Sequence, residues 1–131
     1  MSATTRTDVS RTVERCRPEN VTAVRLDAAA LESTAHDYLD EVRAELLAEG
    51  KTPARLVVEA SFDADCSFAT QEEADRVREY VYAASYLGAS AVTVDVTAVA
   101  DETKVRPALA ACAERARREG VSLELDGNLS L

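Results

Sequence analysis

Two kinds of hydrophobic spacing alternate along this chain, and each predicted helix ends at a glycine. Apolar residues recur at every second position in 54–62, 92–97 and 121–125, which is typical of strands with one buried face. Between these stretches they recur every three or four positions, which predicts amphipathic helices. Gly50, Gly88 and Gly120 stand where these helices should end, because glycine readily adopts the left-handed conformation of a helix C-terminus.

The pattern predicts the element order β-α-β-α-β-α-β, beginning with a strand at 20–26. Asp27 is expected to cap a helix that runs to Gly50, and Pro107 is expected in the first turn or so of the last helix. Right-handed crossovers between neighbouring parallel strands place all helices on one side of a sheet. We therefore expect an α/β fold of the two-layer sandwich type, with a mostly parallel four-stranded sheet, helices mainly on one face, and a comparatively polar opposite face.

The length of 131 residues fits one domain. Residues 1–19 are a polar N-terminal tail, for which disorder and a short helix with Val9, Val13 and Cys16 on one side are both open. Residues 20–131 form the predicted single α/β domain.

Acidic residues outnumber basic ones by 24 to 15, and the only lysines are Lys51 and Lys104. This composition keeps a protein soluble at high salt and favours a halophilic, cytoplasmic protein. A net charge of −9 argues against binding nucleic acid or an anionic membrane surface. The N-terminus has no apolar signal segment.

The loop that follows the second predicted strand carries the main candidate site: Asp63, Asp65, Ser67 and Thr70. Thr70 and Glu73 have the spacing of a helix-capping box. Free amides at that helix start would favour an anion such as a phosphate, whereas Asp63 and Asp65 together with Asp95 could hold Mg²⁺. An ordinary capped loop remains open, and Cys66 within it is expected to have a raised pKa because of the two aspartates.

Other candidates come from the outward positions of the elements. Glu59, Asp95 and Glu124 would form a ridge if their strands are neighbours, offset by Arg25 or Arg55, by a divalent cation or by solvent. Tyr82 and Tyr86, with Arg78 one turn earlier, have the composition of an interface, although both rings could pack between helices instead. The single histidine, His36, is expected to be solvated beside Glu32 and Asp40.

Residues 20–126 resemble the STAS domains, the anti-sigma-factor antagonist fold, in its stressosome-like branch. The resemblance lies in the strand Arg55–Phe62 with its acidic turn, Ser67 and Thr70, and in the Leu-Gly-Ala passage from helix to strand at 87–89. It implies a protein-interaction domain without enzymatic activity, switched by phosphate on Ser67 or Thr70.

We therefore expect a non-enzymatic, cytoplasmic regulatory domain that needs no cofactor and that binds a protein partner or itself. Two alternatives stay open. One is a small Mg²⁺-dependent enzyme that acts on a phosphorylated ligand through Asp63, Asp65 and Asp95. The other is a structural homo-oligomer built on Tyr82 and Tyr86.

Overall fold

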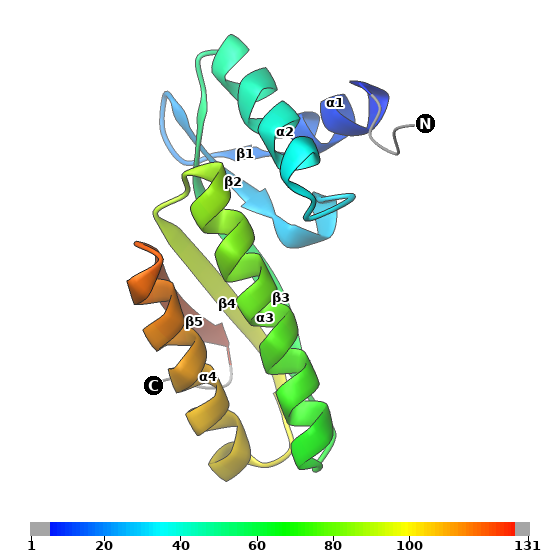
Figure 1. Cartoon of the computed structure of the whole chain (residues 1–131), viewed down its shortest axis with the longest axis vertical. Coiled ribbons are helices and arrows are strands. Elements are labelled where there is room, and N and C mark those ends of the chain that lie inside the picture. Colours follow the sequence, from blue (N-terminus) through cyan, green and yellow to red (C-terminus); the bar gives the residue numbers. More distant parts are fainter. Residues whose placement is uncertain (1–5, 128–131) are drawn as a thin grey trace.

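The computed structural model describes residues 6–127 and has an α/β fold with a five-stranded, mostly parallel sheet (Figure 1). The strands are β1 (Arg17–Pro18), β2 (Ala23–Asp27), β3 (Thr52–Phe62), β4 (Ala91–Val99) and β5 (Ser122–Gly127). The helices are α1 (Arg6–Glu14), the 3-10 turn η1 (Ala28–Ala30), α2 (His36–Ala48), α3 (Ser67–Leu87) and α4 (Glu102–Arg118).

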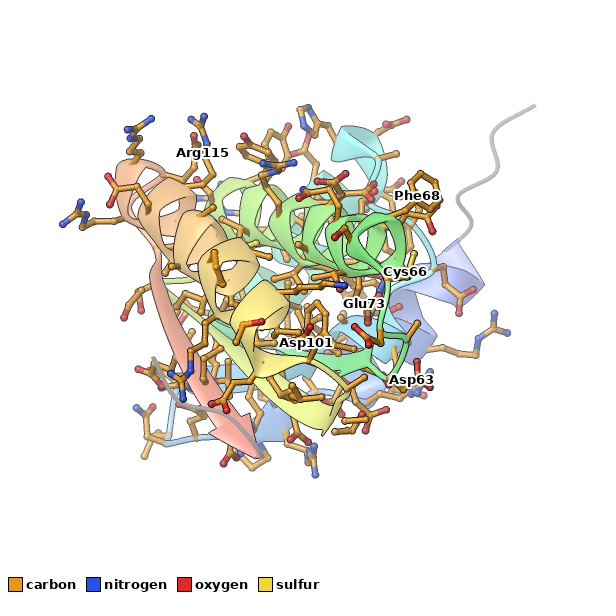
Figure 2. All side chains as sticks on the ribbon, turned by 90° about the horizontal axis from the view of Figure 1, so that it is seen from below. Asp63, Cys66, Phe68, Glu73, Asp101 and Arg115 are labelled. Atoms are coloured by element: carbon orange, nitrogen blue, oxygen red, sulfur yellow. The ribbon has the colours of Figure 1, made fainter. Side chains whose placement is uncertain are left out.

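The strands lie side by side in sequence order, and only β1 is antiparallel to its neighbour. Helices α2, α3 and α4 each connect two adjacent parallel strands, and α3 and α4 lie together over one face of the sheet (Figure 2). This arrangement confirms the predicted α/β class. The sheet has one strand more than the four predicted. The extra strand is the edge strand β1, whose two residues are too few to leave a hydrophobic pattern in the sequence.

The core lies between the helix layer and the sheet, on the predicted faces of the elements. Most buried residues of β3 and β4 are the alternating ones, Leu56, Val58, Ala60, Phe62, Val92, Val94 and Val96; Pro53 and Ala91, near the strand starts, are buried as well. The helices contribute buried residues that recur every three or four positions: Tyr38, Val42, Leu46, Ala74, Val77, Val81, Ala84, Leu87, Val105, Leu109, Cys112 and Ala116. Leu31 and Ala35, which fit the same spacing, lie before α2 and are not buried. Burial of these side chains is the main stabilising contribution to the fold.

The helix predicted to follow its cap Asp27 begins eight residues later than expected, at His36. Asp27 makes no capping hydrogen bond and instead forms an ion pair with Arg17 at 3.1 Å. Residues 31–35 are held outside the helix by side chains: the Glu32 N–H donates to the Tyr38 hydroxyl at 3.1 Å, and the Ala35 N–H donates to the Ser33 hydroxyl at 2.9 Å. Such bonds compete with the helical ladder.

Helix α1 (Arg6–Glu14) packs on α2. Val9 and Val13 on α1 are buried, and the Thr12 hydroxyl donates to the Ala30 carbonyl at 2.9 Å. In the described part of the chain, this region therefore has the short helix that the spacing of Val9 and Val13 indicates.

Pro107 is the sixth residue of α4, deeper than the first turn. The helix begins at Glu102, where Asp101 caps it by accepting the Thr103 N–H at 3.0 Å. The proline is exposed and the helix continues beyond it for three turns.

Candidate functional site

The acidic loop lies at the carboxyl end of β3, beside the start of α4. Lys104 on α4 ties the two segments together, since its Nζ lies 3.1 Å from Asp65 Oδ1 and 3.9 Å from Asp101 Oδ2. Hydrogen bonding to Asp65 raises the pKa of Lys104. Asp63 is exposed on the same loop (Figure 2). The structure thus brings the loop together with a lysine that the sequence patterns had not selected.

Helix α3 begins at Ser67, so the predicted capping box at Thr70 is wrong. Thr70 lies within the first helical turn, donates its N–H to the Cys66 carbonyl at 3.0 Å, and is only 5% exposed. Ser67 at the start of the same turn is exposed. The structure therefore separates the two candidate switch residues, because Ser67 is accessible to a modifying enzyme and Thr70 is buried.

Cys66 occupies the N-cap position of α3 and is exposed. Its pKa is lowered, mainly by the backbone N–H of Ala69 and then by that of Phe68. The expected rise caused by the two aspartates is wrong, because the helix amides outweigh the repulsion from Asp65.

Glu73 does not close a capping box but fastens α3 to β3. It accepts the Ser61 N–H at 2.9 Å and binds Arg76 at 2.9 Å, and Arg76 donates to the Glu59 carbonyl at 2.6 Å. Burial raises the pKa of Glu73, but the hydrogen bonds from Arg76 and Ser61 outweigh it, so the pKa is lowered overall. This clamp fixes the position of the first turns of α3.

A shallow groove of about 330 Å³ runs between the first turns of α3 and α4. Ser67, Gln71, Lys104 and Pro107 lie along it, over a floor of small apolar side chains. Phe68 projects from the same turn of α3 as Ser67 and is 71% exposed, although most large apolar side chains of this domain are buried (Figure 2). Phe68 does not line the groove and points from α3 away from α4 (Figure 2). We call the groove together with Phe68, which is adjacent to Ser67 in the chain, the α3–α4 surface. It combines an apolar anchor, a cation and a modifiable hydroxyl, which are features of protein-binding surfaces.

The three acids of the predicted Mg²⁺ site do not form one. Asp65 is paired with Lys104 on the loop, whereas Asp95 lies on the helix-free face of the sheet opposite Glu59. Among residues 6–127, no group of three or more histidines, cysteines, aspartates or glutamates could hold a metal ion. The loop and strand β4 direct these carboxylates to different sides of the sheet.

Tyr86 of the predicted interface packs within the molecule. Its ring stacks on His36 with centroids 4.0 Å apart, and its hydroxyl donates to Asp40 at 3.1 Å, which raises the pKa of Tyr86. Tyr82 is 43% exposed, and Arg78 forms an ion pair with Asp75. His36 is exposed, as expected. The ring that it contacts is Tyr86 of α3.

The predicted ridge of Glu59, Asp95 and Glu124 exists in altered form. Glu59 faces Asp95 in register, but Asp95 faces Asp126, while Glu124 lies beside Thr93 and binds Arg55 at 2.6 Å. The sequence does not specify the strand register, and the register places Asp126, not Glu124, beside Asp95 and Glu59.

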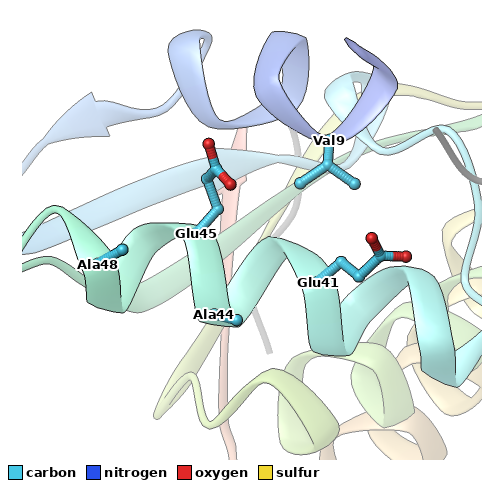
Figure 3. Close-up of a pocket in the computed structure, with 5 residues that line it drawn as sticks. All are labelled: Val9, Glu41, Ala44, Glu45 and Ala48. Atoms are coloured by element: carbon cyan, nitrogen blue, oxygen red, sulfur yellow. The ribbon is translucent and has the colours of Figure 1, made fainter. Parts of the chain in front are cut away.

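A second small hollow of about 180 Å³ separates α1 from α2 (Figure 3). Val9 points into it from α1, and Glu41 and Glu45 flank it on α2 together with two alanines. Its size fits a few water molecules.

The sequence reasoning missed Phe68, Lys104 and Pro107 as neighbours of the loop. One signal was available for Lys104: Asp101 and Lys104 follow the strand next to the acidic loop, and carboxyl ends of adjacent parallel strands meet at one edge of the sheet. No helix within the described range 6–127 has the length and apolar character needed to cross a bilayer.

Comparison with solved structures shows the fold alone. The chain is similar to a xylose isomerase domain protein from Planctomyces limnophilus, with a TM-score of 0.60 and 14% identity. The similarity covers 91% of this chain and 46% of that one, so the chain spans about half the length of its structural relative. Comparison with curated proteins finds no match. Residues 20–125 match the family described as "Domain of unknown function (DUF8564)", and the chain belongs to that family.

Proposed function

We propose that this domain is a non-enzymatic regulatory module that binds a protein partner through the α3–α4 surface. The observation that carries the proposal is Phe68, an aromatic side chain that is 71% exposed in the first turn of a helix whose large aliphatic residues, Val77, Val81 and Leu87, are buried. Exposed aromatic residues are common anchors of protein interfaces. The resemblance of the strand Arg55–Phe62 and its following turn to STAS domains supports the same class of function.

Ser67 is the proposed switch within this surface. It is exposed, it lies beside Lys104 in the groove, and it is the first residue of α3. A phosphate there would gain from Lys104, while competing with Asp65 for the lysine and with the Cys66 sulfur for the backbone amides of Phe68 and Ala69. The Lys104–Asp65 contact at 3.1 Å is exposed and thus weak enough to exchange. Thr70 is excluded from this role by its burial.

The acid-rich, lysine-poor composition supports a cytoplasmic protein adapted to high salt. The binding experiment should therefore use a high-salt native lysate, with the tagged domain as bait and mass spectrometry as the readout.

The variants Phe68→Ser and Ser67→Glu test the surface directly. We expect a partner that the wild type retains to be lost with Phe68→Ser and changed at least several-fold with Ser67→Glu. Leu47→Ser is the matched control, because Leu47 is an equally apolar, 54% exposed residue on α2, away from the groove. If the partner still binds the Phe68→Ser variant but no longer binds the Leu47→Ser variant, the proposal is refuted. If the partner binds the Ser67→Glu variant as strongly as the wild type, only the proposed switch is refuted.

A further inference from the structure

The two edges of the sheet differ in their chemistry. Within residues 6–127, strand β1 forms one edge, is two residues long and contains Pro18, which has no N–H to donate. Strand β5 forms the other edge, is six residues long and contains neither proline nor lysine. Short strands, proline and lysine are common protections of a sheet edge. We propose that β5 pairs antiparallel with β5 of a second copy of the chain, so that the two sheets become continuous.

The backbone of β5 has the groups that such pairing needs. In a parallel ladder, each residue directs its N–H and its C=O to the same neighbouring strand, and successive residues alternate in direction. The Ser122 N–H donates to the Ser90 carbonyl at 2.9 Å, on the side of β4. Leu123 and Leu125 therefore direct their N–H and C=O groups away from β4. Within residues 6–127, no further strand lies on that side.

Charge excludes two of the three central registers for this pair. A two-fold axis perpendicular to the sheet keeps both helix layers on one face. A pair centred on Glu124 would place that carboxylate opposite its own copy. A pair centred on Leu125 would place Glu124 opposite Asp126 of the second copy. Like charges on directly opposed strand positions are destabilising, so both arrangements are disfavoured.

The register centred on Leu123 opposes no like charges among residues 121–125. It places Ser122 opposite Glu124 of the second copy, where the serine hydroxyl can donate to the carboxylate. Glu124 keeps its ion pair with Arg55 at 2.6 Å, because a carboxylate accepts several hydrogen bonds. Two-fold symmetry makes each of these contacts twice.

The apolar side chains at this edge support the same register. Leu123 and Leu125 are half-buried and lie on the core side of the sheet, next to buried residues of β4. A hollow of about 450 Å³ is lined in part by Ala113 and by residues 120–123. Pairing centred on Leu123 places Leu125 of the second copy opposite Val121, beside this hollow. Apolar surface that one copy leaves partly exposed is thereby buried.

Sedimentation equilibrium of the full chain tests the association. At about 1 M salt, where the Debye length is about 3 Å and repulsion between chains of charge −9 is screened, we expect a dimer at about 100 µM protein. No larger species should form, because the β1 edge is blocked. Leu123→Pro should be monomeric, since it removes an N–H at the centre of the pair but no donor to β4. Leu123→Ala keeps that N–H and should still dimerise.

Charge at Ser122 gives a second test, at an exposed position where folding is not at risk. At about 0.15 M salt, where the Debye length is about 8 Å, Ser122→Lys should dimerise at least tenfold more tightly than Ser122→Glu, because each faces Glu124 of the second copy. Ala44→Lys and Ala44→Glu make the same changes in net charge at an exposed position of α2 and should differ far less.

Disulfide cross-linking tests the register itself. Cys66→Ser first removes the exposed native thiol. In that background Leu123→Cys should give a cross-linked dimer, because directly opposed Cα atoms lie about 5.5 Å apart, within the range that a disulfide spans. Glu124→Cys and Leu125→Cys should not, because their Cα atoms would be more than about 7 Å from their copies.

The outcomes separate this proposal from the α3–α4 surface. Phe68→Ser should leave the dimer unchanged. A wild type that stays monomeric, a Leu123→Pro variant that dimerises like the wild type, equal dimerisation of Ser122→Lys and Ser122→Glu, or cross-linking at 124 or 125 instead of 123 would each overturn the pairing of β5 described above.

Discussion

Thr12 on α1 and Tyr38 on α2 share a buried hydrogen bond between their hydroxyl groups. The Thr12 hydroxyl also contacts the Ala30 carbonyl, and the Tyr38 hydroxyl accepts the Glu32 N–H at 3.1 Å. The three bonds connect the N-terminal helix, the 3-10 turn and the segment before α2. This network explains why residues 31–35 stay outside the helix and why α1 is held against the domain.

Tyr38→Phe should therefore destabilise the protein by about 1–3 kcal/mol, because it leaves the Glu32 N–H without its acceptor while keeping the ring. Urea unfolding followed by circular dichroism measures the change. Tyr82→Phe, at an exposed position, is the control and should change the free energy of unfolding by less than about 0.5 kcal/mol. Equal effects of both variants would show that the buried network does not contribute.

Gly127→Ala should destabilise the end of β5 more than Gly50→Ala destabilises the end of α2. Both glycines have positive φ, at 95° and 72°, so alanine costs about 1–2 kcal/mol of backbone energy at each. At Gly127 an added Cβ would also lie 2.3 Å from the Val96 carbonyl oxygen, whereas nothing lies within 4 Å at Gly50. Thermal unfolding of the two variants checks the order, and a larger loss for Gly50→Ala would contradict the packing of β5 on β4.

Leu46 and Leu47 are adjacent on α2 and have opposite environments. Leu46 is fully buried and Leu47 is 54% exposed. Leu46→Ala should cost about 2–5 kcal/mol through lost burial and the resulting cavity, and Leu47→Ala less than about 1 kcal/mol. Both variants have the same change in helix propensity, so the difference in their urea midpoints reports burial alone. Similar midpoints would indicate that α2 packs on the sheet through a different face.

Glu73 should make stability depend on pH in the acidic range. Its pKa is lowered in the folded protein, so its contribution is fully present above the unfolded pKa of about 4.3 and is lost as the pH falls through the folded pKa. Glu73→Gln has no such proton to take up. The stability advantage of the wild type over Glu73→Gln should therefore be largest near pH 7 and shrink below about pH 4.3.

Urea midpoints at several pH values measure this difference. Glu72→Gln, at the exposed neighbouring position, makes the same charge change and is the control. An advantage over Glu73→Gln that stays constant from pH 7 to pH 3 would contradict the clamp between Glu73, Arg76 and Ser61.

The spacing of apolar residues determined most of the fold by itself. The alternation at 54–62 and 92–97 predicted which side chains of β3 and β4 are buried, and the glycines at 50, 88 and 120 marked the helix ends. These features depend only on the period of each element and on local backbone preference, so they are readable from the chain. Helix starts were less predictable, because the bonds that fix them involve side chains distant in sequence, such as Thr12 with Tyr38.

For the candidate site, too, some features could be predicted from the sequence and others depended on the tertiary structure. The sequence determined that an acidic loop with Ser67 follows β3 and leads into a helix. Only the tertiary structure decided that Lys104 binds Asp65, that Thr70 is buried, and that Asp126 rather than Glu124 joins Glu59 and Asp95. The reason is physical: hydrophobic patterning determines which face of an element is buried, whereas contacts between elements depend on strand register and on how loops meet at the sheet edge, and these are set by the packing of the whole domain.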